Sequence, residues 1–411
     1  MKSSGVVTVL DIGSAKVCCC IAHVFDDGRF EIMGIGYCIC CGVKSGVIVD
    51  VKSVEKSIAK AVESAEKMAN IRIKSVYVSV SGKNVESQIV NMSLNAGGRI
   101  IGSEDILHLF DYCNRQDGDK AIIHSIPILY KVDSLNGIKN PVGMVAHSLS
   151  VSMNIVTVPE AQLNNLLICL ARCHLDPVGI VSSVYASGLC VMDDDDMLSS
   201  QIVIDFGGGT TSIGFFYNGV FSGMEVIPLG GKHITDDVAY GLNISVANAE
   251  RLKTLYGSAL SSIHDESDVI FTPVVEDDDV INLQQISKSS INQIIQPRVE
   301  EILLMAKKRI EESSFTGGFA RSVIITGGGS MLTGLRDLAG VILNKKIKAK
   351  KMENFIDGSD ILVNNNFSVA VGMIKFAHLS NDYLTKTKSS SNNEDGGGFL
   401  KKTLAWIENN L

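Results

Sequence analysis

No uninterrupted apolar stretch of the sequence is long enough to span a lipid bilayer, so no transmembrane helix is expected. A basic excess is also missing: the formal net charge of the 411 residues is −8, whereas non-specific nucleic-acid binding needs a basic face. Near the N-terminus a single lysine precedes a strand-like run broken by Asp11, without a cleavage-site pattern, so no signal peptide is expected. The sequence therefore predicts a folded cytosolic protein without a nucleic-acid partner.

The ten cysteines lack the spacing of a metal site. No Cys-x-x-Cys pair lies near a matched second pair or a His-x-x-x-His pattern. Cys18, Cys19 and Cys20 are consecutive on a predicted strand, so neighbours point to opposite faces and cannot share one tetrahedral ion. We expect reduced cysteines that pack as small apolar side chains.

Two familiar phosphate-binding signatures are absent as well. No glycine run is followed by Gly-Lys-Ser or Gly-Lys-Thr, and no dinucleotide fingerprint opens a helix. Instead, a β-branched run from Ile202 ends at Asp205 and leads through Gly207-Gly208-Gly209-Thr210-Thr211 into a second strand pattern. Because glycine has no Cβ, the backbone N–H groups of such a turn can approach an anion closely. A carboxylate just before the turn can hold a hydrated divalent cation that phosphates share.

Two further stretches repeat this theme. Val6 to Leu10 is a strand-like run followed by Asp11, after which Ile12-Gly13-Ser14-Ala15-Lys16 turns into another run. Two strand–Asp–Gly-turn–strand units, about two hundred residues apart, indicate an internal duplication. A third cluster, Thr326 to Ser330, follows a strand pattern and precedes a helix expected from Met331. That order suits the sugar or α-phosphate side of a nucleotide.

The three glycine stretches, in this order, resemble the actin/Hsp70/sugar-kinase superfamily. The resemblance implies an α/β, ribonuclease H-like duplicated fold in which two lobes close over ATP and Mg²⁺. Lys16 would offset phosphate charge, and Asp11 and Asp205 would order the water ligands of Mg²⁺. The residues expected to bind the nucleotide are Asp11, Gly13, Ser14, Lys16, Asp205, Gly207, Gly208, Gly209, Thr210, Thr211, Gly327, Gly328, Gly329 and Ser330.

Residues 82–158 depart from actin and narrow the resemblance. They predict short alternating strands and a capped helix from Ser103. The order Pro127, Tyr130, Val132-Asp133, Gly137 and Pro141-x-Gly-Met resembles the inserted subdomain of the FtsA family. A later pattern, Gly-Gly-x-x-Ile-Thr-Asp followed by Ala-Glu-x-x-Lys, resembles the same family. There the resemblance implies that Glu250 and Lys253 border adenine and ribose, although three-residue spacing alone also fits a surface ion pair.

The next segment is expected to bind a partner. Residues 258–296 read as strand-poor and acidic, with a charge run from Glu276 to Asp279, and Pro297 is expected at the first turn of a helix over 298–313. In FtsA this subdomain receives the acidic and apolar C-terminal peptide of FtsZ, the tubulin-like ring GTPase. An exposed arginine such as Arg298 is the contact that we assign to that peptide.

The remaining elements concern the hinge and hydrolysis. A helix is expected over 160–175. Another helix is expected to begin at Ser187-Gly188 and to cross, between the lobes, a second helix that contains residues 369–373. Asp193 to Asp196 is interpreted as a solvated linker. By chain order, Glu160 or Gln162 occupies the place from which superfamily members position the attacking water. The match to the superfamily pattern is poor there, so at most slow ATPase activity is expected.

The C-terminal sequence predicts a tethered amphipathic helix. Residues 385–398 are polar and glycine-rich, like a flexible linker. After them, an apolar stripe with two flanking aromatics comprises Phe399, Leu400, Leu404, Trp406, Ile407 and Leu411. Such a helix would fold against a bilayer, or alternatively dock on its own domain or on a partner. FtsA proteins end in a membrane-targeting helix, which favours the bilayer.

The resemblance also implies a division into subdomains. The expected ranges are 1–82 for subdomain 1A, 83–158 for the insert 1C, 159–195 for 1A continued, 196–230 for 2A, 231–305 for 2B, 306–384 for 2A continued with a return to 1A, 385–398 for the linker and 399–411 for the membrane-targeting helix.

The expected function is that of an actin-like ATP-binding cell-division protein. It would polymerise head to tail on the inner face of the cytoplasmic membrane at the division septum, bind FtsZ and other divisome proteins, and contact lipid through its tail. The alternatives are a scaffold like the type IV pilus protein PilM, which lacks this tail, or a superfamily kinase, which needs a catalytic Asp and a substrate pocket. An Hsp70-type chaperone would need a peptide-binding domain that the tail is too short to form.

Overall fold

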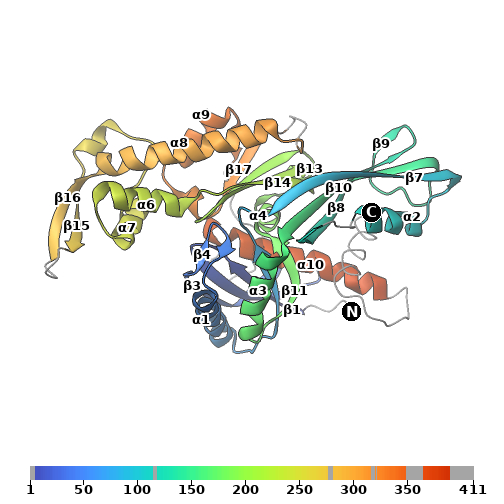
Figure 1. Ribbon diagram of the computed structural model, residues 1–411, viewed down its shortest axis with the longest axis horizontal. Helices are drawn as coiled ribbons and strands as arrows, with labels where there is room; N and C mark the ends of the chain where they lie inside the picture. Colours follow the sequence, from blue (N-terminus) through green and yellow to red (C-terminus); the bar gives the residue numbers. More distant parts are fainter. Residues whose placement is uncertain are drawn as a thin grey trace.

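Two five-stranded sheets organise the chain, and a computed structural model describes residues 5–113, 118–275, 281–315, 320, 322–348 and 364–388. Figure 1 shows a first lobe below the centre, a second lobe extending to the upper left and an inserted sheet to the right. Each of these parts contains its own cluster of buried apolar side chains. None of the helices in the described ranges is long and apolar enough to cross a bilayer.

The sheet of the first lobe has the strand order β11-β6-β1-β2-β3. Its strands are β1 (Gly5–Ile12), β2 (Lys16–Val24), β3 (Phe30–Ile39), β6 (Ser75–Val80) and β11 (Asp176–Ser182). The first three pair antiparallel, whereas β1–β6 and β6–β11 pair parallel. A small hairpin, β4 (Val43–Lys44) with β5 (Val47–Ile48), precedes helix α1.

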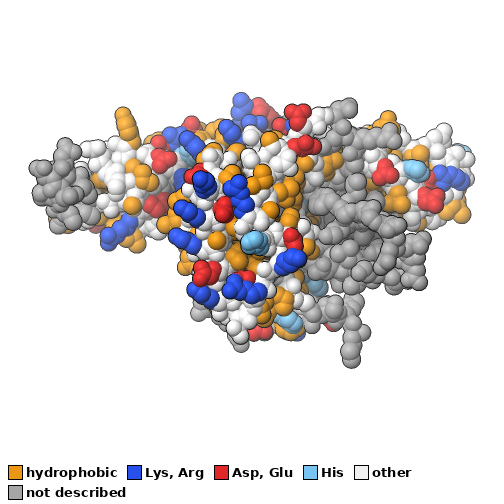
Figure 2. All heavy atoms as spheres, turned by 60° about the horizontal axis from the view of Figure 1, so that its bottom comes forward, with side chains coloured by type: hydrophobic (Ala, Val, Ile, Leu, Met, Phe, Trp, Pro, Cys, Tyr) orange, Lys and Arg blue, Asp and Glu red, His pale blue; other side chains and the backbone are white. Residues whose placement is uncertain are grey.

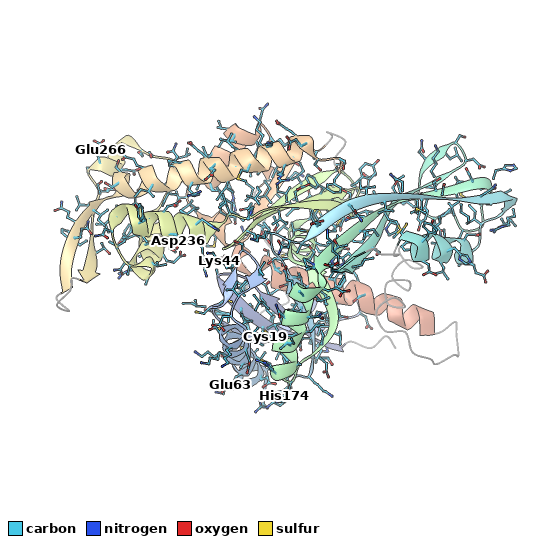
Figure 3. The ribbon with its side chains drawn as sticks, viewed as in Figure 1. Cys19, Lys44, Glu63, His174, Asp236 and Glu266 are labelled. Atoms are coloured by element: carbon cyan, nitrogen blue, oxygen red, sulfur yellow. The ribbon has the colours of Figure 1, made fainter. Side chains whose placement is uncertain are left out.

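Helices cover both faces of this sheet. Helices α1 (Val51–Ala69) and α3 (Glu160–Arg172) pack on one face, and α4 (Ser183–Val191) and α10 (Ser368–Lys388) pack on the other. Double cover explains why Cys18, Cys19 and Cys20 are all buried although neighbours on a strand point to opposite faces. Figure 3 shows Cys19 inside this lobe, near α1. Burial raises the pKa of these thiols, which favours the neutral form.

The second lobe repeats the same arrangement, with the order β14-β13-β12-β17-β18. Its strands are β12 (Gln201–Phe206), β13 (Thr211–Tyr217), β14 (Val220–Ile227), β17 (Ser322–Thr326) and β18 (Lys346–Lys348). Asp11 pairs with Cys18, one step before the turn of its hairpin, and Asp205 pairs with Ser212 at the equivalent step. The two aspartates are thus structural counterparts in a duplicated sheet.

The insert is a four-stranded sheet, β7-β10-β8-β9, with helix α2 (Ser103–Cys113) on it. Its strands are β7 (Glu86–Ile100), β8 (Lys120–Val132), β9 (Leu135–Ile138) and β10 (Val145–Pro159). The prediction of short strands is wrong, because β7, β8 and β10 have 15, 13 and 15 residues. Bulges in the pairing of β8 with β10 shift the alternation, which makes one long strand look like several short ones.

Helices and one hairpin complete the second lobe: α6 (Gly231–Leu242), α7 (Val246–Tyr256), a 3₁₀ turn η1 (Ile263–Glu266), β15 (Val269–Val275), β16 (Ile281–Ser287) and α8 (Lys288–Glu312). The prediction of a strand-poor segment is wrong, since β15 and β16 pair along their length. The prediction rested largely on the charge run at Glu276 to Asp279, which lies outside the described residues.

The helix predicted from Arg298 in fact begins ten residues earlier, and Pro297 lies inside it. Ser287 caps the helix by accepting the N–H of Ser290. A proline within a helix removes one hydrogen bond and costs about 3 kcal/mol. A continuous stripe of buried side chains on both sides of the proline offsets that cost, namely Ile291, Ile295, Val299, Ile302 and Leu303.

Other boundaries also differ. Helix α4 begins at Ser183 and not at Ser187, and the helix expected from Met331 is a 3₁₀ turn, η2 (Gly328–Met331), followed by α9 (Leu335–Leu343). Helix α10 extends four residues into the range expected as a linker. The remainder of that linker and residues 399–411 lie outside the described ranges.

The acidic run at Asp193 to Asp196 is not a solvated linker. It forms a one-turn helix, α5 (Asp194–Met197), in which Asp193 and Asp196 cap each other. Asp196 is 1% exposed and its carboxylate lies 2.5 Å from the ammonium of Lys348, on β18. The charge is buried because its partner arrives from 152 positions further along the chain.

Candidate functional site

Asp11 and Asp205 line one cleft of about 690 Å³ between the two lobes. Both side chains are largely buried, and each is held at the end of its hairpin by the duplicated strand pairing. The cleft is lined by Asp11, Gly13, Ser14, Ala15, Lys16, Ser81, Ser183, Asp205, Gly207, Gly208, Gly209, Thr210, Ser212, Gly327, Gly328, Asn366, Ser368 and Val369. Three glycine-rich stretches that are far apart in the sequence therefore meet around one pair of carboxylates.

The electrostatics of the two carboxyl groups favour cation binding. Burial raises the pKa of Asp11, while a 2.7 Å hydrogen bond from Ser79 and the charge of Lys16 work in the opposite direction. Burial and the negative charge of Asp11 raise the pKa of Asp205 to about 7. Two neighbouring buried acids repel each other when both are ionised, and a divalent cation removes that cost. Hard oxygen donors of this kind suit hydrated Mg²⁺.

Any such cation would take most of its ligands from elsewhere. Within the part of the chain that the structure describes, no group of three or more His, Cys, Asp and Glu side chains converges to hold a metal. Two carboxylates alone leave most of an octahedral shell open, and Mg²⁺ usually fills it with water and phosphate oxygens. The donor set therefore fits a metal–phosphate complex better than a bare metal ion.

The first two glycine loops pack directly on each other. Gly13 N donates to Lys16 O and Gly207 N donates to Thr210 O, both at 2.9 Å, which closes two tight turns. A Cβ on Gly209 would lie 2.3 Å from Ser14 Oγ, and one on Gly208 would lie 2.6 Å from the Cβ of Ala15. Larger residues would push the lobes apart, so glycine is needed here for close approach.

The third loop approaches Asp205 from the other side. Gly327 has φ +83°, and a Cβ there would lie 2.3 Å from Asp205 Oδ1. Gly327 and Gly328 line the cleft. Gly329 instead packs on the ring of Phe206, and the Ser330 hydroxyl donates to Gly327 O at 2.7 Å. These last two residues shape the loop and do not line the cleft. The same holds for Thr211, whose hydroxyl donates to Leu229 O at 2.9 Å.

Lys16 differs from the lysines of the surface. Figure 2 shows several lysine and arginine side chains on the surface of the face that is turned forward. On α1, for example, Lys52, Lys56 and Lys60 are exposed. Lys16 is instead partly buried in the cleft, and burial lowers its pKa, against the attraction of Asp11 and Asp205. Its ammonium donates to the carbonyl of Asn366 and lies 3.8 Å from the ring centroid of Phe367.

Glu250 and Lys253 form a pair on α7 beside the second loop. The ammonium of Lys253 lies 2.7 Å from Glu250 Oε2 and donates to Thr235 Oγ1 and Gly231 O. Burial alone would raise the pKa of Glu250, but Lys253 and the hydrogen bonds of Thr235 and Thr254 hold it below its usual value. Gly231 N in turn donates to Gly207 O at 2.9 Å. The pair does not line the cleft itself but supports the helix that touches the loop.

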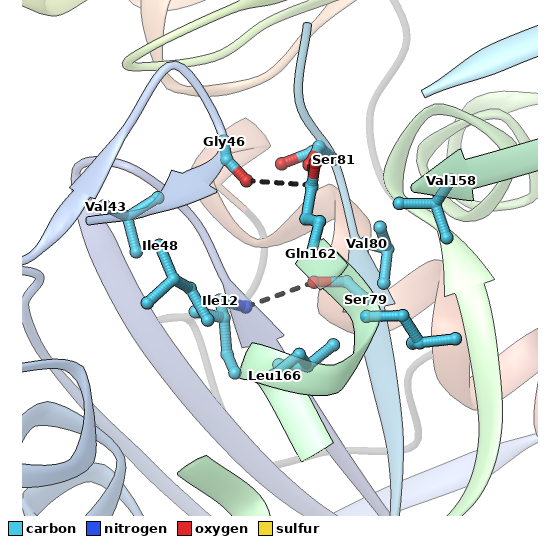
Figure 4. A pocket seen from close by; sticks show the side chains of 11 residues that line it. Ile12, Val43, Gly46, Ile48, Ser79, Val80, Ser81, Val158, Gln162 and Leu166 are labelled. Atoms are coloured by element: carbon cyan, nitrogen blue, oxygen red, sulfur yellow. Dashed lines mark hydrogen bonds between the residues drawn. The ribbon is translucent and has the colours of Figure 1, made fainter. Parts of the chain in front are cut away.

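The two candidate hydrolytic residues separate clearly. Glu160 is exposed at the start of α3, whereas Gln162 lines a second, smaller pocket. Figure 4 shows Gln162 between Gly46 and Ser81, to whose carbonyls its Nε2 donates at 3.4 and 3.3 Å. Its Oε1 is buried and has no partner among the described residues. Ser81 lines both cavities, so Gln162 lies next to the cleft.

Arg298 is less free than the sequence suggests. Its side chain is 28% exposed, and its guanidinium lies 2.5 Å from Asp237 Oδ2 and also pairs with Glu301. The expectation that Arg298 is exposed is therefore wrong, because α6 supplies an acid that sequence spacing does not reveal. Its assignment to the peptide stays a prediction. The six tail residues Phe399, Leu400, Leu404, Trp406, Ile407 and Leu411 lie outside the described residues.

Sequence reasoning missed the turn that precedes α10, η4 (Asn365–Phe367). Asn366 and Ser368 line the cleft, and Asn365 Nδ2 donates to Ser330 Oγ at 3.0 Å. The one available signal was position: three asparagines, at 364–366, stand two residues before the small-residue segment at 369–373. Asparagine readily caps helices, and Asn364 does so here by accepting the N–H of Asn366.

Duplicated sheets, a shared acidic cleft and two crossing helices define a two-lobed protein with an actin-like fold. A chain of a PilM-PilN type IV pilus biogenesis complex has the same fold, with a TM-score of 0.64 and 15% identity over 90% of this chain and 98% of that one. MreB5 of Spiroplasma citri bound to ADP matches with a TM-score of 0.56 and 13% identity over 94% and 99%. The predicted fold class is confirmed.

The sequence relatives identify the family. A family model described as "Cell division protein FtsA" matches residues 202–372, and one described as "SHS2 domain inserted in FTSA" matches residues 82–157. A cell division protein FtsA of Agrobacterium fabrum is 39% identical over 359 residues, which are 84% of this chain and 81% of the relative. The chain belongs to the FtsA family of cell-division proteins, as the sequence motifs predicted.

Proposed function

We propose that this chain binds Mg-ATP in the cleft between its lobes and, with nucleotide bound, polymerises on the inner face of the cytoplasmic membrane to tether FtsZ there. The observation that carries the proposal is the pair of buried aspartates, Asp11 and Asp205, in one cleft with three glycine loops. The actin-like fold, which MreB5 shares in its complex with ADP, supports it.

Each group in the cleft has a role that its chemistry suggests. The amides of Ser14 and of Gly208 to Thr210 would hold phosphate oxygens, because these loops leave room for close backbone approach. The N–H groups of Gly13 and Gly207 close the two turns instead and so give the loops their shape. Asp11 and Asp205 would bind the water ligands of Mg²⁺, which supplies charge neutralisation between them. Lys16 would offset phosphate charge. On the sugar and base side, Gly327 and Gly328 would border the ribose. The Glu250–Lys253 pair lies outside the cleft lining, so it would border ribose and adenine only where the nucleotide extends past the second loop toward α7.

For hydrolysis we assign the positioning of water to Gln162 and not to Glu160. Gln162 is half-buried beside the cleft, and its Oε1 atom is buried without a partner among the described residues, whereas Glu160 is exposed. An amide can orient water but cannot take its proton, so turnover would be slow. Gln162→Ala should reduce ATP turnover while leaving nucleotide affinity within about twofold, and Glu160→Ala should change neither.

The role at the membrane rests on family membership and on the tail sequence. Family membership implies divisome partners, and the apolar stripe of residues 399–411 suits the cytoplasmic surface of the membrane at the septum. A filament would combine many weakly binding tails into strong attachment. The FtsZ peptide is assigned to the subdomain of α6, α7 and α8, where release of Arg298 from Asp237 would be needed for it to bind an acidic peptide.

Two experiments test the proposal. Isothermal titration of Asp205→Ala with Mg-ATP should show no binding, and wild-type affinity in this variant would remove the central role of the cleft. Co-sedimentation with anionic vesicles should compare the full chain with one ending at Lys388, with and without ATP and an FtsZ tail peptide. The shortened chain should stay in solution and still bind ATP. Equal sedimentation of both chains would show that the tail does not carry membrane binding, and would favour the PilM-like scaffold, which has no such tail.

A further inference from the structure

Lys16 has partners that a phosphate-binding role does not explain. Its ammonium donates to the Asn366 carbonyl and lies over the Phe367 ring, 3.8 Å from the centroid. Both partners belong to η4, about 350 positions further along the chain, directly before helix α10. The negative face of an aromatic ring attracts a cation, and the attraction grows when the cation is partly removed from water, as it is here.

Phe367 is held in place by its surroundings. It is 7% exposed, and Tyr37 of β3 packs edge-on against it with ring centroids 5.6 Å apart. On the other side, Asn365 joins the turn to Ser330 of the third glycine loop. The turn therefore contacts the first lobe through Lys16 and Tyr37 and the second lobe through Ser330.

The turn η4 is directly connected to the place where α4 and α10 cross. Helix α10 begins at Ser368, whose buried hydroxyl lines the cleft and has no partner in the described ranges. One turn later, a Cβ on Gly372 would lie 1.7 Å from Ala186 O of α4. Helices this close cannot slide independently, so a shift at the start of α10 must also move α4.

We propose that Phe367 and the Asn366 carbonyl are positioning groups for Lys16, and that nucleotide phosphates compete with them for its ammonium. The proposal rests on the proposed nucleotide function of the cleft and adds the coupling of that site to α10. A phosphate carries full negative charge, whereas a carbonyl and a ring carry only partial charge, so bound phosphate draws the ammonium away. The turn then keeps only the Tyr37 contact with the first lobe, and the start of α10 is held less firmly.

The first test titrates full-length variants with a fluorescent ATP analogue and Mg²⁺. Phe367→Leu removes the competing ring and tightens binding roughly three- to tenfold. Phe367→Tyr keeps a ring that attracts cations and retains wild-type affinity. Phe376→Leu is the matched control, because it makes the same change on α10, where the ring packs against Tyr77, His124 and Tyr185. A ring with a merely structural role would weaken binding when removed. Weaker or unchanged binding by Phe367→Leu overturns the proposal.

The second test needs no nucleotide and covers the case in which Phe367→Leu does not fold. Amide hydrogen exchange is compared between the wild type, Lys16→Met, and Lys52→Met, which changes an exposed lysine of α1. Loss of the Lys16 ammonium speeds exchange over residues 367–373, and the control does not. Wild-type exchange in Lys16→Met overturns the proposal even when the chain binds nucleotide. If the wild type bound no nucleotide, the proposed function would fail, and faster exchange in Lys16→Met would still support the tie between Lys16 and the turn.

Discussion

At the residue scale, the buried carboxylates of Asp11 and Asp205 repel each other, and a bound cation would relieve that repulsion. Burial raises the pKa of both carboxyls, and the charge of Asp11 contributes to the value of about 7 for Asp205. When the pKa of a carboxyl is higher in the folded chain than its unfolded value of 3.8, ionising that carboxyl destabilises the fold. For Asp205 the free energy of unfolding therefore falls as the pH rises from about 4 to about 7. The fold is thus less stable when both carboxyls are ionised, unless a cation binds between them.

Asp205→Asn should therefore stabilise the chain at high pH. Without nucleotide, we expect its free energy of unfolding at pH 8 to exceed that of the wild type by about 2 kcal/mol, because the amide removes one of two repelling charges. At pH 5 the difference should largely vanish, since Asp205 is then protonated. Urea denaturation at both pH values measures this. An equal difference at pH 5 and pH 8 would contradict the raised pKa.

The same titration should appear in metal-dependent binding. A proton competes with Mg²⁺ for Asp205, so the factor by which Mg²⁺ strengthens ATP binding should rise about tenfold between pH 6 and pH 8. Asp205→Asn should lose this pH dependence. Titrations with and without Mg²⁺ at each pH, on both proteins, separate the effect from the titration of ATP itself. A parallel rise in the variant would assign the proton to another group.

Close approach of the two loops gives a third residue-scale prediction. Gly209→Ala adds a Cβ 2.3 Å from Ser14 Oγ, so the loops must separate. We expect a loss of about 1–3 kcal/mol of stability and weaker Mg-ATP binding. Gly102→Ala is the control, because it has an ordinary backbone and no neighbour nearer than 3.9 Å. Thermal melting and calorimetric titration measure both. A fully tolerated Gly209→Ala would show that the loops separate freely.

At the element scale, the sequence predicted what local chemistry determines. The hairpins that end in Asp11 and Asp205 were predicted because strand, acid and glycines are contiguous. The β15–β16 hairpin was missed because an acidic run masks its β-branched residues, and the start of α8 was misplaced because Pro297 reads as a first-turn residue. Burial against neighbouring helices outweighed the proline, and burial is not visible locally.

The crossing of α4 and α10 depends on one missing methyl group. A Cβ on Gly372 would lie 1.7 Å from the carbonyl oxygen of Ala186, so Gly372→Ala must spread the two helices. We expect a loss of about 3 kcal/mol or more in the free energy of unfolding, despite the better helix propensity of alanine. Gly340→Ala in α9, with no neighbour nearer than 3.7 Å, should be neutral or stabilising. Denaturant melts of both variants decide, and equal midpoints would argue against a tight crossing.

At the scale of the whole molecule, the contacts that join its parts could not have been predicted. Lys16 meets Asn366, Asp196 meets Lys348, and the insert meets the second lobe where Asn154 Nδ2 donates to Phe221 O at 3.1 Å. Each pair is far apart in the sequence, and although Lys16 belongs to the first glycine motif, no motif points to its partner Asn366. The cleft was predictable because its parts repeat, whereas the couplings between the lobes and the insert depend on single pairs.

Asn154 provides the test of one such coupling. It is fully buried, accepts from the Ser87 hydroxyl at 2.6 Å and donates to the carbonyl of Phe221 on β14. Asn154→Ala leaves both groups without a partner, which should cost about 1–3 kcal/mol and speed amide exchange in β7 and β10. Asn91→Ala is the matched control in the same sheet, because among the described residues the side chain of this exposed asparagine is hydrogen-bonded to Ser152 alone. If both variants lost the same stability, the insert would gain nothing from its contact with the second lobe.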